Sequence, residues 1–258
     1  PQVWAWRKGR VKQIKKLIDS MAVILPIEVD FYASYGYTVQ YVGHSMADQV
    51  KSSFTPQAAR GEFGLAEAAP TIGLLPGSRS AEVSRLLPEM IKAARIISAR
   101  MPEAQYIIPL ADTLRQESVR GLIAGAGIDV KIVSGRIYDV LAACDLAIVT
   151  SGTATLEAGL IGVPMVIVYK MSVLSALIGK LIINPEFIGL VNIIAGKSVA
   201  PELIQLNATG RRIASEALGI LLDSDRKLKM IHELKNIREK LGEPGAARKA
   251  AQIACNMI

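Results

Sequence analysis

Residues 74–80, Leu-Leu-Pro-Gly-Ser-Arg-Ser, combine small and cationic side chains in a pattern that suits an anion. They follow a short apolar run and precede a long amphipathic one, which predicts a turn from a strand into a helix. Gly77 lets the backbone approach a ligand, and Ser78 or Ser80 is placed to cap the helix. The amides of a helix start favour an anion, and the guanidinium of Arg79 matches phosphate. The alternative is an ordinary capped turn, because the segment is neither a Walker loop nor a GxGxxG motif.

A second turn of this kind spans residues 150–158, Thr-Ser-Gly-Thr-Ala-Thr-Leu-Glu-Ala. Glu157 lies one helical turn beyond Thr153 on the same face, where a carboxylate can accept both hydroxyls of a ribose. The alternative for Glu157 is a solvated carboxylate that only favours the helix dipole. Two such turns in one sheet favour a nucleotide-sugar site over ordinary turns. The residues with amides or hydroxyls for a diphosphate are Ser151, Gly152, Thr153, Ala154 and Thr155.

A third constellation runs from residue 187 to residue 205. Asn192 is a lone polar side chain in an apolar stretch, and such a group needs hydrogen bonds from the core or from a ligand. The residues alone favour a structural role for it. His44 and His232 have no residues near them in sequence at the spacing of metal ligands. The sequence also shows no Ser-His-Asp set, no paired catalytic carboxylates and no zinc motif. The sequence therefore predicts no metal and no cofactor, and it leaves the catalytic residues unassigned.

Strands and helices alternate strictly around these turns, which predicts an α/β fold with a parallel, doubly wound sheet and right-handed crossovers. A helical tail follows, with Gly242 and Pro244 as stop signals between its last two helices. The expected strands are residues 71–75, 105–110, 129–133, 146–150 and 165–169, and the expected helices are 81–100, 114–124, 137–143, 153–161, 216–222, 226–241 and 246–257.

The first part of the chain has a different pattern. Residues 3–20 carry an apolar helical stripe under a basic face, and short strands are expected at 21–25 and 39–42. Around residues 55–70 the composition shifts to Ala, Glu, Gly and Pro without apolar periodicity, as in a linker. We therefore divide the chain into a remnant of an N-terminal domain (1–55), a linker (56–70) and a complete C-terminal Rossmann-like domain with its helical tail (71–258).

Composition limits the class of protein. Hydrophobic residues make up 51% of the chain and aromatic residues only 5%, which indicates an aliphatic core. The formal net charge of +7 suggests an anionic partner, such as nucleic acid, an acidic lipid surface or a phosphorylated substrate. The longest apolar candidate, residues 173–183, is broken by Lys180 and falls short of the roughly 20 residues of a membrane span. Cys144 and Cys255 lack metal-like spacing, so inert thiols in a reducing compartment are expected.

Several segments in this order resemble the lipid-A-disaccharide synthase family, inverting glycosyltransferases of the two-Rossmann-domain (GT-B) architecture. The resemblance covers essentially the whole chain, and the combination is more specific than any one motif. The matching stretches are PQVWAWRKGRVKQIKK from Pro1, VGHSMAD from Val42, LLPGSRSAEV from Leu74, SGTATLEAGLIGVPMVIVYKMS from Ser151, and GLVNIIAG with PELIQ between Gly189 and Gln205.

The resemblance implies transfer of 2,3-diacylglucosamine from its UDP carrier to 2,3-diacylglucosamine 1-phosphate, giving the lipid A disaccharide phosphate and UDP. It implies a metal-free, cytoplasmic enzyme that lies peripherally on the inner membrane of a Gram-negative bacterium, and it allows a homodimer. Ser78 and Arg79 would meet the phosphates beside Gly77, with residues 151–155 as the diphosphate loop. Glu157 would hold the ribose. The donor site would be lined by Asn192, Glu202 and Gln205.

Two departures from the family pattern matter. Val191 stands where the family usually has Pro, so the loop that presents Asn192 is expected to be less rigid. The chain begins at Pro1 rather than Met, and the family's acceptor domain with its acidic base is expected upstream of it. We therefore expect these residues alone to bind the UDP donor without turnover.

Two other classes of protein compete with this interpretation. A non-hydrolysing UDP-N-acetylglucosamine epimerase shares the fold and the UDP site, but its catalytic carboxylates and histidines stand in motifs that are not found here. A nucleic-acid-binding module is suggested by the basic first helix with Trp4 and Trp6. The basic residues do not recur through the α/β part of the chain, so we expect no nucleic-acid partner.

Overall fold

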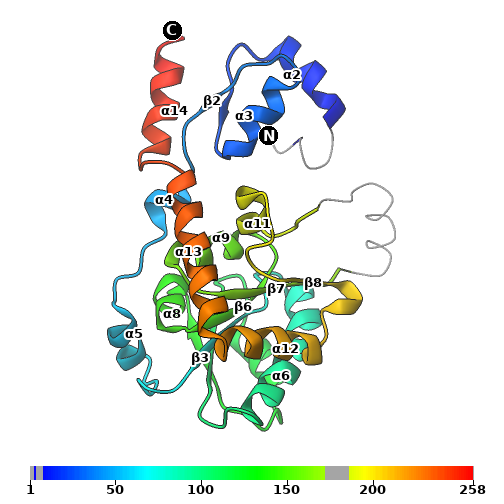
Figure 1. Ribbon diagram of the computed structural model, residues 1–258, viewed down its shortest axis with the longest axis vertical. Coiled ribbons are helices and arrows are strands. Elements are labelled where there is room, and N and C mark those ends of the chain that lie inside the picture. Colours follow the sequence, from blue (N-terminus) through cyan, green and yellow to red (C-terminus); the bar gives the residue numbers. More distant parts are fainter. Residues whose placement is uncertain (1–2, 4–7, 172–185, 258) are drawn as a thin grey trace.

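The computed structural model describes residue 3, residues 8–171 and residues 186–257. The chain forms a large lobe built on a sheet and a small lobe above it (Figure 1). The apolar stretch at 173–183 and the residues Trp4, Trp6 and Arg7 lie outside the described residues. Within the described ranges, no helix combines the length and the apolar composition that a membrane crossing requires.

Six parallel strands form the sheet of the large lobe, in the order β5-β4-β3-β6-β7-β8. In chain order this is the 3-2-1-4-5-6 arrangement of doubly wound nucleotide-binding sheets. The α/β class and the parallel sheet predicted from the sequence are thereby confirmed. The strands are β3 (Thr71–Leu75), β4 (Gln105–Leu110), β5 (Val130–Ser134), β6 (Leu146–Thr150), β7 (Met165–Tyr169) and β8 (Glu202–Ile204).

Helices cover the large sheet because its strands are apolar on both faces, with every residue of β3 and β6 buried. The core between sheet and helices is mainly aliphatic, as the low aromatic content predicts. The covering helices are α6 (Ser80–Ser98), α7 (Gln116–Ile123), α8 (Ile137–Ala143), α9 (Thr153–Ile161), α11 (Leu190–Ala195), α12 (Gly210–Leu221) and α13 (Ser224–Lys240), with the short turn η2 (Gln205–Asn207) between β8 and α12.

The sequence prediction gives the exact bounds of β3, β4, β6, β7, α8 and α9. For the other predicted elements of the large lobe, most of the observed ends differ from the prediction by one or two residues. The largest shift is in α12, which begins at Gly210 rather than at residue 216. Thr209 sets this earlier start, because its hydroxyl accepts a hydrogen bond from the amide of Arg212. The prediction did not separate α11 and β8 from the surrounding apolar stretch, since both are short.

The small lobe holds a two-stranded parallel sheet, in which β1 (Ala22–Val23) pairs with β2 (Gln40–Tyr41). Both strands are shorter than predicted, and the basic helix is a 3-10 turn, η1 (Lys8–Arg10), followed by α2 (Val11–Leu17). The lobe is completed by α3 (Pro26–Ala33). The next helix, α4 (Met46–Gln49), lies below this lobe, where Met46 and Ala47 pack against the core of the large lobe. The small lobe has its own small core of Val3, Val11, Met21, Val23, Tyr32 and Val39.

The segment expected to be a linker contains a helix, α5 (Pro56–Glu62), which packs against α8. Ala59 is fully buried, with Leu65 beside it in the same apolar cluster. Arg60 forms a 2.6 Å ion pair with Asp145, at the start of β6. The segment that leaves the small lobe is therefore anchored to the large lobe.

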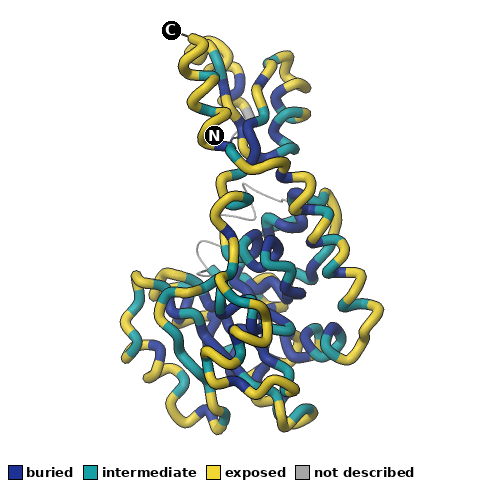
Figure 2. Tube along the Cα trace, turned by 90° about the vertical axis from the view of Figure 1, so that its left-hand side faces the viewer, coloured by how far each residue is buried: buried dark blue, intermediate teal, exposed yellow. Residues whose placement is uncertain are grey.

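The chain returns to the small lobe through α13 and α14 (Ala246–Cys255), so that two segments connect the lobes (Figures 1 and 2). The hydroxyl of Tyr41 donates a 2.7 Å hydrogen bond to the carbonyl oxygen of Leu241. The amide of Gly245 donates to the carboxylate of Asp48 at 2.9 Å. These bonds hold the α13–α14 connection against the end of β2 and against α4.

Packing of α12 on α6 gives a stability prediction. A Cβ at Gly210 would lie 2.5 Å from the Cβ of Lys92 and 3.1 Å from the backbone nitrogen of Ala93. Because α6 must shift to make room, we expect Gly210→Ala to lower the free energy of unfolding by about 1–3 kcal/mol. Gly121→Ala in α7 is the control, because its Cβ would meet nothing within 4 Å, and it should be neutral or stabilising. Urea denaturation measures both variants, and equal stability of the two would contradict the prediction.

Candidate functional site

The two turns identified from the sequence lie side by side in the structure. β3 and β6 are hydrogen-bonded neighbours, with Leu75 opposite Val149, so both turns leave the same carboxyl edge of the sheet. A Cβ at Gly77 would lie 3.3 Å from Cγ2 of Thr150, which places the first turn against the end of β6. The chain changes direction across the sheet between β3 and β6, and doubly wound sheets bind ligands at this switch point.

Gly77 is required for the first turn. Its φ of +112° is unfavourable for other residues, and a Cβ would lie 2.5 Å from Oε2 of Glu82. The hydroxyl of Thr113, from the loop after β4, donates a 2.6 Å hydrogen bond to the carbonyl oxygen of Ser78. The backbone of the turn is therefore fixed by contacts on both sides.

The start of α6 differs from the prediction. The helix begins at Ser80 with Arg79 as its N-cap residue, and no side chain caps it, so the expected cap by Ser78 or Ser80 is wrong. The guanidinium of Arg79 pairs with Glu82 at 2.7 Å, yet 79% of the Arg79 side chain is exposed. Such a solvated pair is weak, so Arg79 remains available to an anion at the helix start.

Two hydroxyls of the second turn are used inside the fold, whereas Gly152 at its tip is exposed. Gly152 has a φ of +153°, and a Cβ there would meet nothing within 4 Å. Thr155 is fully buried, and its hydroxyl donates to the carbonyl oxygen of Gly152 and accepts from the amide of Leu190. The hydroxyl of Ser151 donates to the carbonyl oxygen of Ile188 at 2.8 Å. Gly152 and Thr153 are exposed, with Ala154 partly covered behind them.

Glu157 lies one turn along α9 from Thr153 and is half-buried. Burial raises the pKa of its carboxyl, because the charged form loses hydration, and a 3.5 Å hydrogen bond from the hydroxyl of Tyr138 partly opposes that rise. The pKa of Tyr138 is itself raised by burial and by the neighbouring carboxylate. Glu157 is therefore a partly desolvated acceptor close to the second turn, and not the fully solvated carboxylate of the alternative interpretation.

Asn192 is fully buried in α11, and its amide is fully used inside the protein. Its nitrogen donates to the carbonyl oxygen of Ala200 and to Glu202, both at 2.8 Å. Its oxygen accepts from the amides of Val199 and Ala200 at 2.8 and 2.9 Å. These bonds support the structural role that the residues alone favour. Val191, the departure from the family pattern, is also fully buried.

Glu202, at the start of β8, holds the loop that enters α11. Its two carboxylate oxygens accept from the amides of Ile188 and Gly189, each at 2.9 Å. The hydroxyl of Ser151 donates a hydrogen bond to this loop, and the hydroxyl of Thr155 accepts one from the amide of Leu190 at its end. A continuous hydrogen-bonded network therefore joins the second turn to β8, and it positions the exposed backbone at Gly152.

Gln205 directly follows β8 and has a φ of +53°, a conformation that few residues other than glycine adopt. Since β8 runs parallel to β7, Gln205 lies at the same carboxyl edge as the two turns, on the far side of β7. Strained backbone of this kind is often found where a ligand is held.

Thr150 begins the second turn in the sequence, but sequence reasoning did not place it among the candidate site residues. It ends β6 between the two turns, it is only 5% exposed, and its hydroxyl has no hydrogen-bond partner among the described residues. A buried hydroxyl that no protein group occupies can make a hydrogen bond with a bound ligand. One signal for it is present in the sequence, a hydroxyl residue at the end of an otherwise apolar strand.

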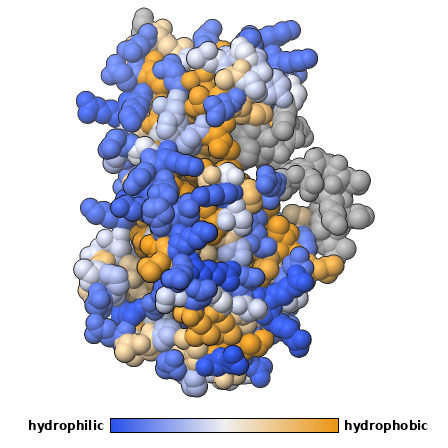
Figure 3. Space-filling view, in the orientation of Figure 1, coloured by the Kyte–Doolittle hydropathy of each residue, from blue (hydrophilic) through white to orange (hydrophobic). Residues whose placement is uncertain are grey.

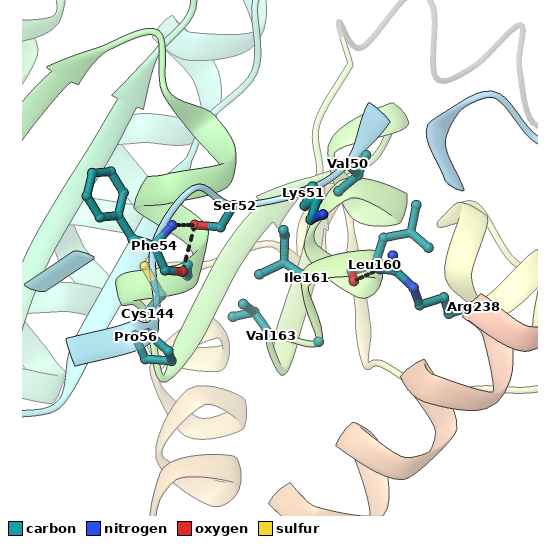
Figure 4. A pocket seen from close by; sticks show the side chains of 12 residues that line it. Val50, Lys51, Ser52, Phe54, Pro56, Cys144, Leu160, Ile161, Val163 and Arg238 are labelled. Atoms are coloured by element: carbon teal, nitrogen blue, oxygen red, sulfur yellow. Dashed lines mark hydrogen bonds between the residues drawn. The ribbon is translucent and has the colours of Figure 1, made fainter. Parts of the chain in front are cut away.

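A hollow of about 330 Å³ lies elsewhere, at the C-terminal end of α9 (Figure 4), whereas the second turn lies at the start of this helix. It is lined by the segment after α4, by the end of α9 and by Arg238, which donates a 2.7 Å hydrogen bond to the carbonyl oxygen of Leu160. Neither of the two turns contributes to it. Cys144 lies in its wall, and burial raises the pKa of this thiol, which agrees with an inert cysteine.

Across residues 8–171 and 186–257, His, Cys, Asp and Glu side chains form no group of three or more that is arranged for a metal ion. The candidate site is instead built from helix starts, Arg79, Thr150 and Glu157. Its arrangement suits a ligand with a phosphate group near the two turns and hydroxyls near Glu157.

Solved structures show the same fold at low sequence identity. The S. aureus protein MnaA, in a co-structure with UDP, is 12% identical with a TM-score of 0.62, over 96% of this chain and 62% of that one. The Anabaena protein HepE, in complex with UDP and glucose, is 16% identical with a TM-score of 0.58, over 98% and 67%. WaaG, a glycosyltransferase involved in lipopolysaccharide biosynthesis, is 12% identical with a TM-score of 0.59, over 90% and 61%. These likenesses support the GT-B fold.

Curated relatives are far more similar. The lipid-A-disaccharide synthases of Syntrophus aciditrophicus and Nitrosococcus oceani are 49% and 47% identical over all of this chain, which covers 68% and 66% of those proteins. The chain thus spans about two thirds of the length of these relatives. The family described as Lipid-A-disaccharide synthetase matches residues 1–257. The chain therefore belongs to the lipid-A-disaccharide synthase family.

Proposed function

We propose that the large lobe binds the UDP part of a sugar nucleotide at the switch point between β3 and β6. The observation that carries this proposal is the juxtaposition of two helix-start turns at adjacent strand ends, one of which faces open space at Gly152. Amides at two helix starts can share the charge of a diphosphate. Family membership supports the same site.

Each candidate group takes a distinct role in this proposal. The amides at the starts of α6 and α9 and the guanidinium of Arg79 bind the diphosphate, and Gly77 and Gly152 let it approach. Glu157 accepts the ribose hydroxyls, while Thr150 offers its buried hydroxyl to the nucleotide. Ser78 and Gln205 border the site. The network through Asn192 and Glu202, together with Ser151 and Thr155, keeps the second turn in place.

We propose that the whole protein is a hexosyltransferase of lipid A biosynthesis. The acceptor hydroxyl of 2,3-diacylglucosamine 1-phosphate forms a bond to the anomeric carbon of the 2,3-diacylglucosamine donor, and the bond from that carbon to UDP breaks. The released negative charge falls on the diphosphate, where helix starts and Arg79 stabilise it electrostatically. The proton of the acceptor hydroxyl passes to a general base, which we do not assign.

The acyl chains of both substrates place the reaction at a membrane, and we propose a cytoplasmic protein attached peripherally to an anionic inner-membrane surface. The basic segment at residues 7–16 supports this proposal. Lys12, Lys15 and Lys16 of α2 are not buried, so their charges can reach a lipid surface. Family membership favours this transferase over the epimerase alternative, because the epimerase likenesses have low identity and support the fold alone.

The first test is calorimetry with UDP. Because Arg79 contributes a charged hydrogen bond, we expect Arg79→Ala to weaken UDP binding by about 1–3 kcal/mol, and Glu157→Ala to have an effect of the same size. Arg100→Ala is the control, since Arg100 follows the far end of α6. Unchanged affinity in both site variants, or an equal loss in the control, would exclude the proposed site.

The second test concerns Thr150. We expect Thr150→Val to weaken UDP binding by about 0.5–1.5 kcal/mol and to leave the unliganded protein at least as stable, because the lost hydroxyl has no partner among the described residues. Thr155→Val should instead lower stability, since the hydroxyl of Thr155 makes two internal hydrogen bonds. Calorimetry and urea denaturation on the two variants separate these outcomes. Destabilisation by Thr150→Val with full UDP affinity would assign Thr150 to the fold alone.

The third test uses the pH dependence of stability. Burial raises the pKa of Glu157 in the folded protein, so folding opposes its ionisation. Above the folded pKa, the wild type carries a destabilising buried charge, whereas below the ordinary carboxyl pKa of about 4.3 both folded and unfolded forms are protonated. Glu157→Gln should therefore be more stable than the wild type at neutral pH, and its advantage should shrink as the pH falls through the raised pKa. A difference that does not change with pH in urea denaturation would refute this.

A further inference from the structure

Arg136 has a backbone conformation that suits glycine. It directly precedes α8, and its φ of +53° lies in the left-handed region, which L side chains disfavour. Among the described residues other than glycine, only Gln205 also has a positive φ. Strain of this kind persists where surrounding contacts require it. The reason for an arginine at this position therefore lies in the contacts of its side chain.

The guanidinium of Arg136 lies between two aromatic rings. Its Cζ atom is 5.3 Å from the ring centre of Phe54 and 5.0 Å from that of Phe63. Both rings belong to residues 50–70, between α4 and β3, which lead from the small lobe to the large one and are here called the linking segment. A guanidinium within about 6 Å of a ring centre is attracted to the ring face. Arg136 therefore holds the linking segment against the start of α8.

Two carboxylates complete the surroundings of Arg136. Its Nη1 atom is 2.7 Å from Glu62 at the end of α5, and its Nε atom is 3.2 Å from Asp139 in the first turn of α8. Asp139 also accepts from the hydroxyl of Ser52 at 3.0 Å and from the amide of Ser53 at 2.9 Å. An isolated exposed ion pair contributes little, but a planar fork that bridges two carboxylates has a fixed geometry. We call this group the Arg136 cluster, which consists of Arg136, Glu62, Asp139, Phe54 and Phe63.

The Arg136 cluster lies close to the carboxylate proposed to bind the ribose. Tyr138, two residues after Arg136, is in the first turn of α8, and its hydroxyl donates a 3.5 Å hydrogen bond to Glu157 of α9. The helices α8 and α9 pack against each other. A bond of this length is at the limit of hydrogen bonding, so a small displacement of the start of α8 would break it. That start is the part of α8 that Arg136 holds.

We propose that Arg136 is a positioning residue of the nucleotide site, which keeps Tyr138 against Glu157 by holding the start of α8 to the linking segment. The inference rests on the proposed function, in which Glu157 accepts the ribose hydroxyls, and it adds the group that places this carboxylate. The bond from Tyr138 limits the rotation of the Glu157 side chain. One guanidinium then sets both the path of the linking segment and the geometry of the ribose acceptor.

The geometry does not favour Arg136 as a direct ligand of the diphosphate. Its charge is already balanced by two carboxylates, whereas Arg79 has one partner and a side chain that is 79% exposed. Arg136 also follows β5, which is separated from β6 by β4 and β3. The helices α5 and α8 lie together at the left-hand side of the large lobe in Figure 1, and hydrophilic residues reach the surface at this side in Figure 3. Arg136 therefore acts on the nucleotide through α8.

Calorimetry of the full chain with UDP and with 2′,3′-dideoxy-UDP, which lacks the ribose hydroxyls, tests the proposal. Arg136→Gly suits the left-handed backbone and removes only the side chain, so we expect the fold to persist. It should weaken UDP binding by about fivefold and leave dideoxy-UDP binding unchanged. Tyr138→Phe should cause the same loss. The double variant should lose no more than either single variant, because both act through one hydrogen bond.

The matched control is Arg226→Gln, which should bind both ligands as the wild type does. Arg226 also forms an ion pair, with Glu216, and its side chain is 39% exposed against 37% for Arg136. This pair lies between α12 and α13 and does not involve α8. An equal loss of UDP affinity in the control would overturn the positioning role of Arg136. Losses that multiply in the Arg136→Gly/Tyr138→Phe variant would also overturn it.

NMR of protein with ¹³C-labelled tyrosine provides a measurement that needs no ligand. The chain has seven tyrosines, and the Tyr138 signal is identified by its disappearance in Tyr138→Phe. We expect this signal to move in Arg136→Gly and to stay in place in Arg226→Gln. An unmoved signal in Arg136→Gly, or an equal loss of UDP and dideoxy-UDP affinity, would refute the inference. A wild type that binds no UDP would refute the proposed function, and the Tyr138 signal would still decide whether Arg136 places Tyr138.

Discussion

Parallel pairing of β3 with β6 is the constraint on which the candidate site depends. The two strands are separated by about seventy residues of chain, yet their hydrogen bonds place Leu75 opposite Val149 and bring the following turns together. Neither turn is a distinctive nucleotide motif by itself. The site depends on this pair because the sheet is wound outward from it in both directions, so the turns into α6 and α9 leave the same edge of the sheet.

The second turn shows how a protein can reserve backbone amides for a ligand. The hydroxyls of Ser151 and Thr155 could in principle bind phosphate, but here they form hydrogen bonds within the protein. These bonds hold the loop before α11. Glu202 holds the same loop through two amides, and Asn192 fastens it to the start of β8. Each of these bonds occupies a polar group that could otherwise bind the ligand. Together they fix the position of the exposed backbone at Gly152.

The relation between the lobes follows from two connections that run in opposite directions. The outgoing segment is anchored to the large lobe by the Arg60–Asp145 ion pair, which is largely shielded from solvent and carries further hydrogen bonds. The returning segment is held to the small lobe by Tyr41 and to α4 by Asp48. Because the helices α13 and α14 bridge both lobes, the large lobe cannot be regarded as independent of the small one, although each has its own apolar core.

The sequence by itself determined the α/β class, the order of elements in the large lobe and the two turns, because apolar periodicity and turn chemistry are local properties. Tertiary structure alone decided the strand order and the helix α5 in the expected linker, since these depend on contacts between distant segments. It also decided which polar groups face a ligand. Thr155 and Thr150 are the same residue type five positions apart, yet the first has two internal partners and the second has none among the described residues. Hydrogen-bond satisfaction depends on neighbours in space, which local sequence does not specify.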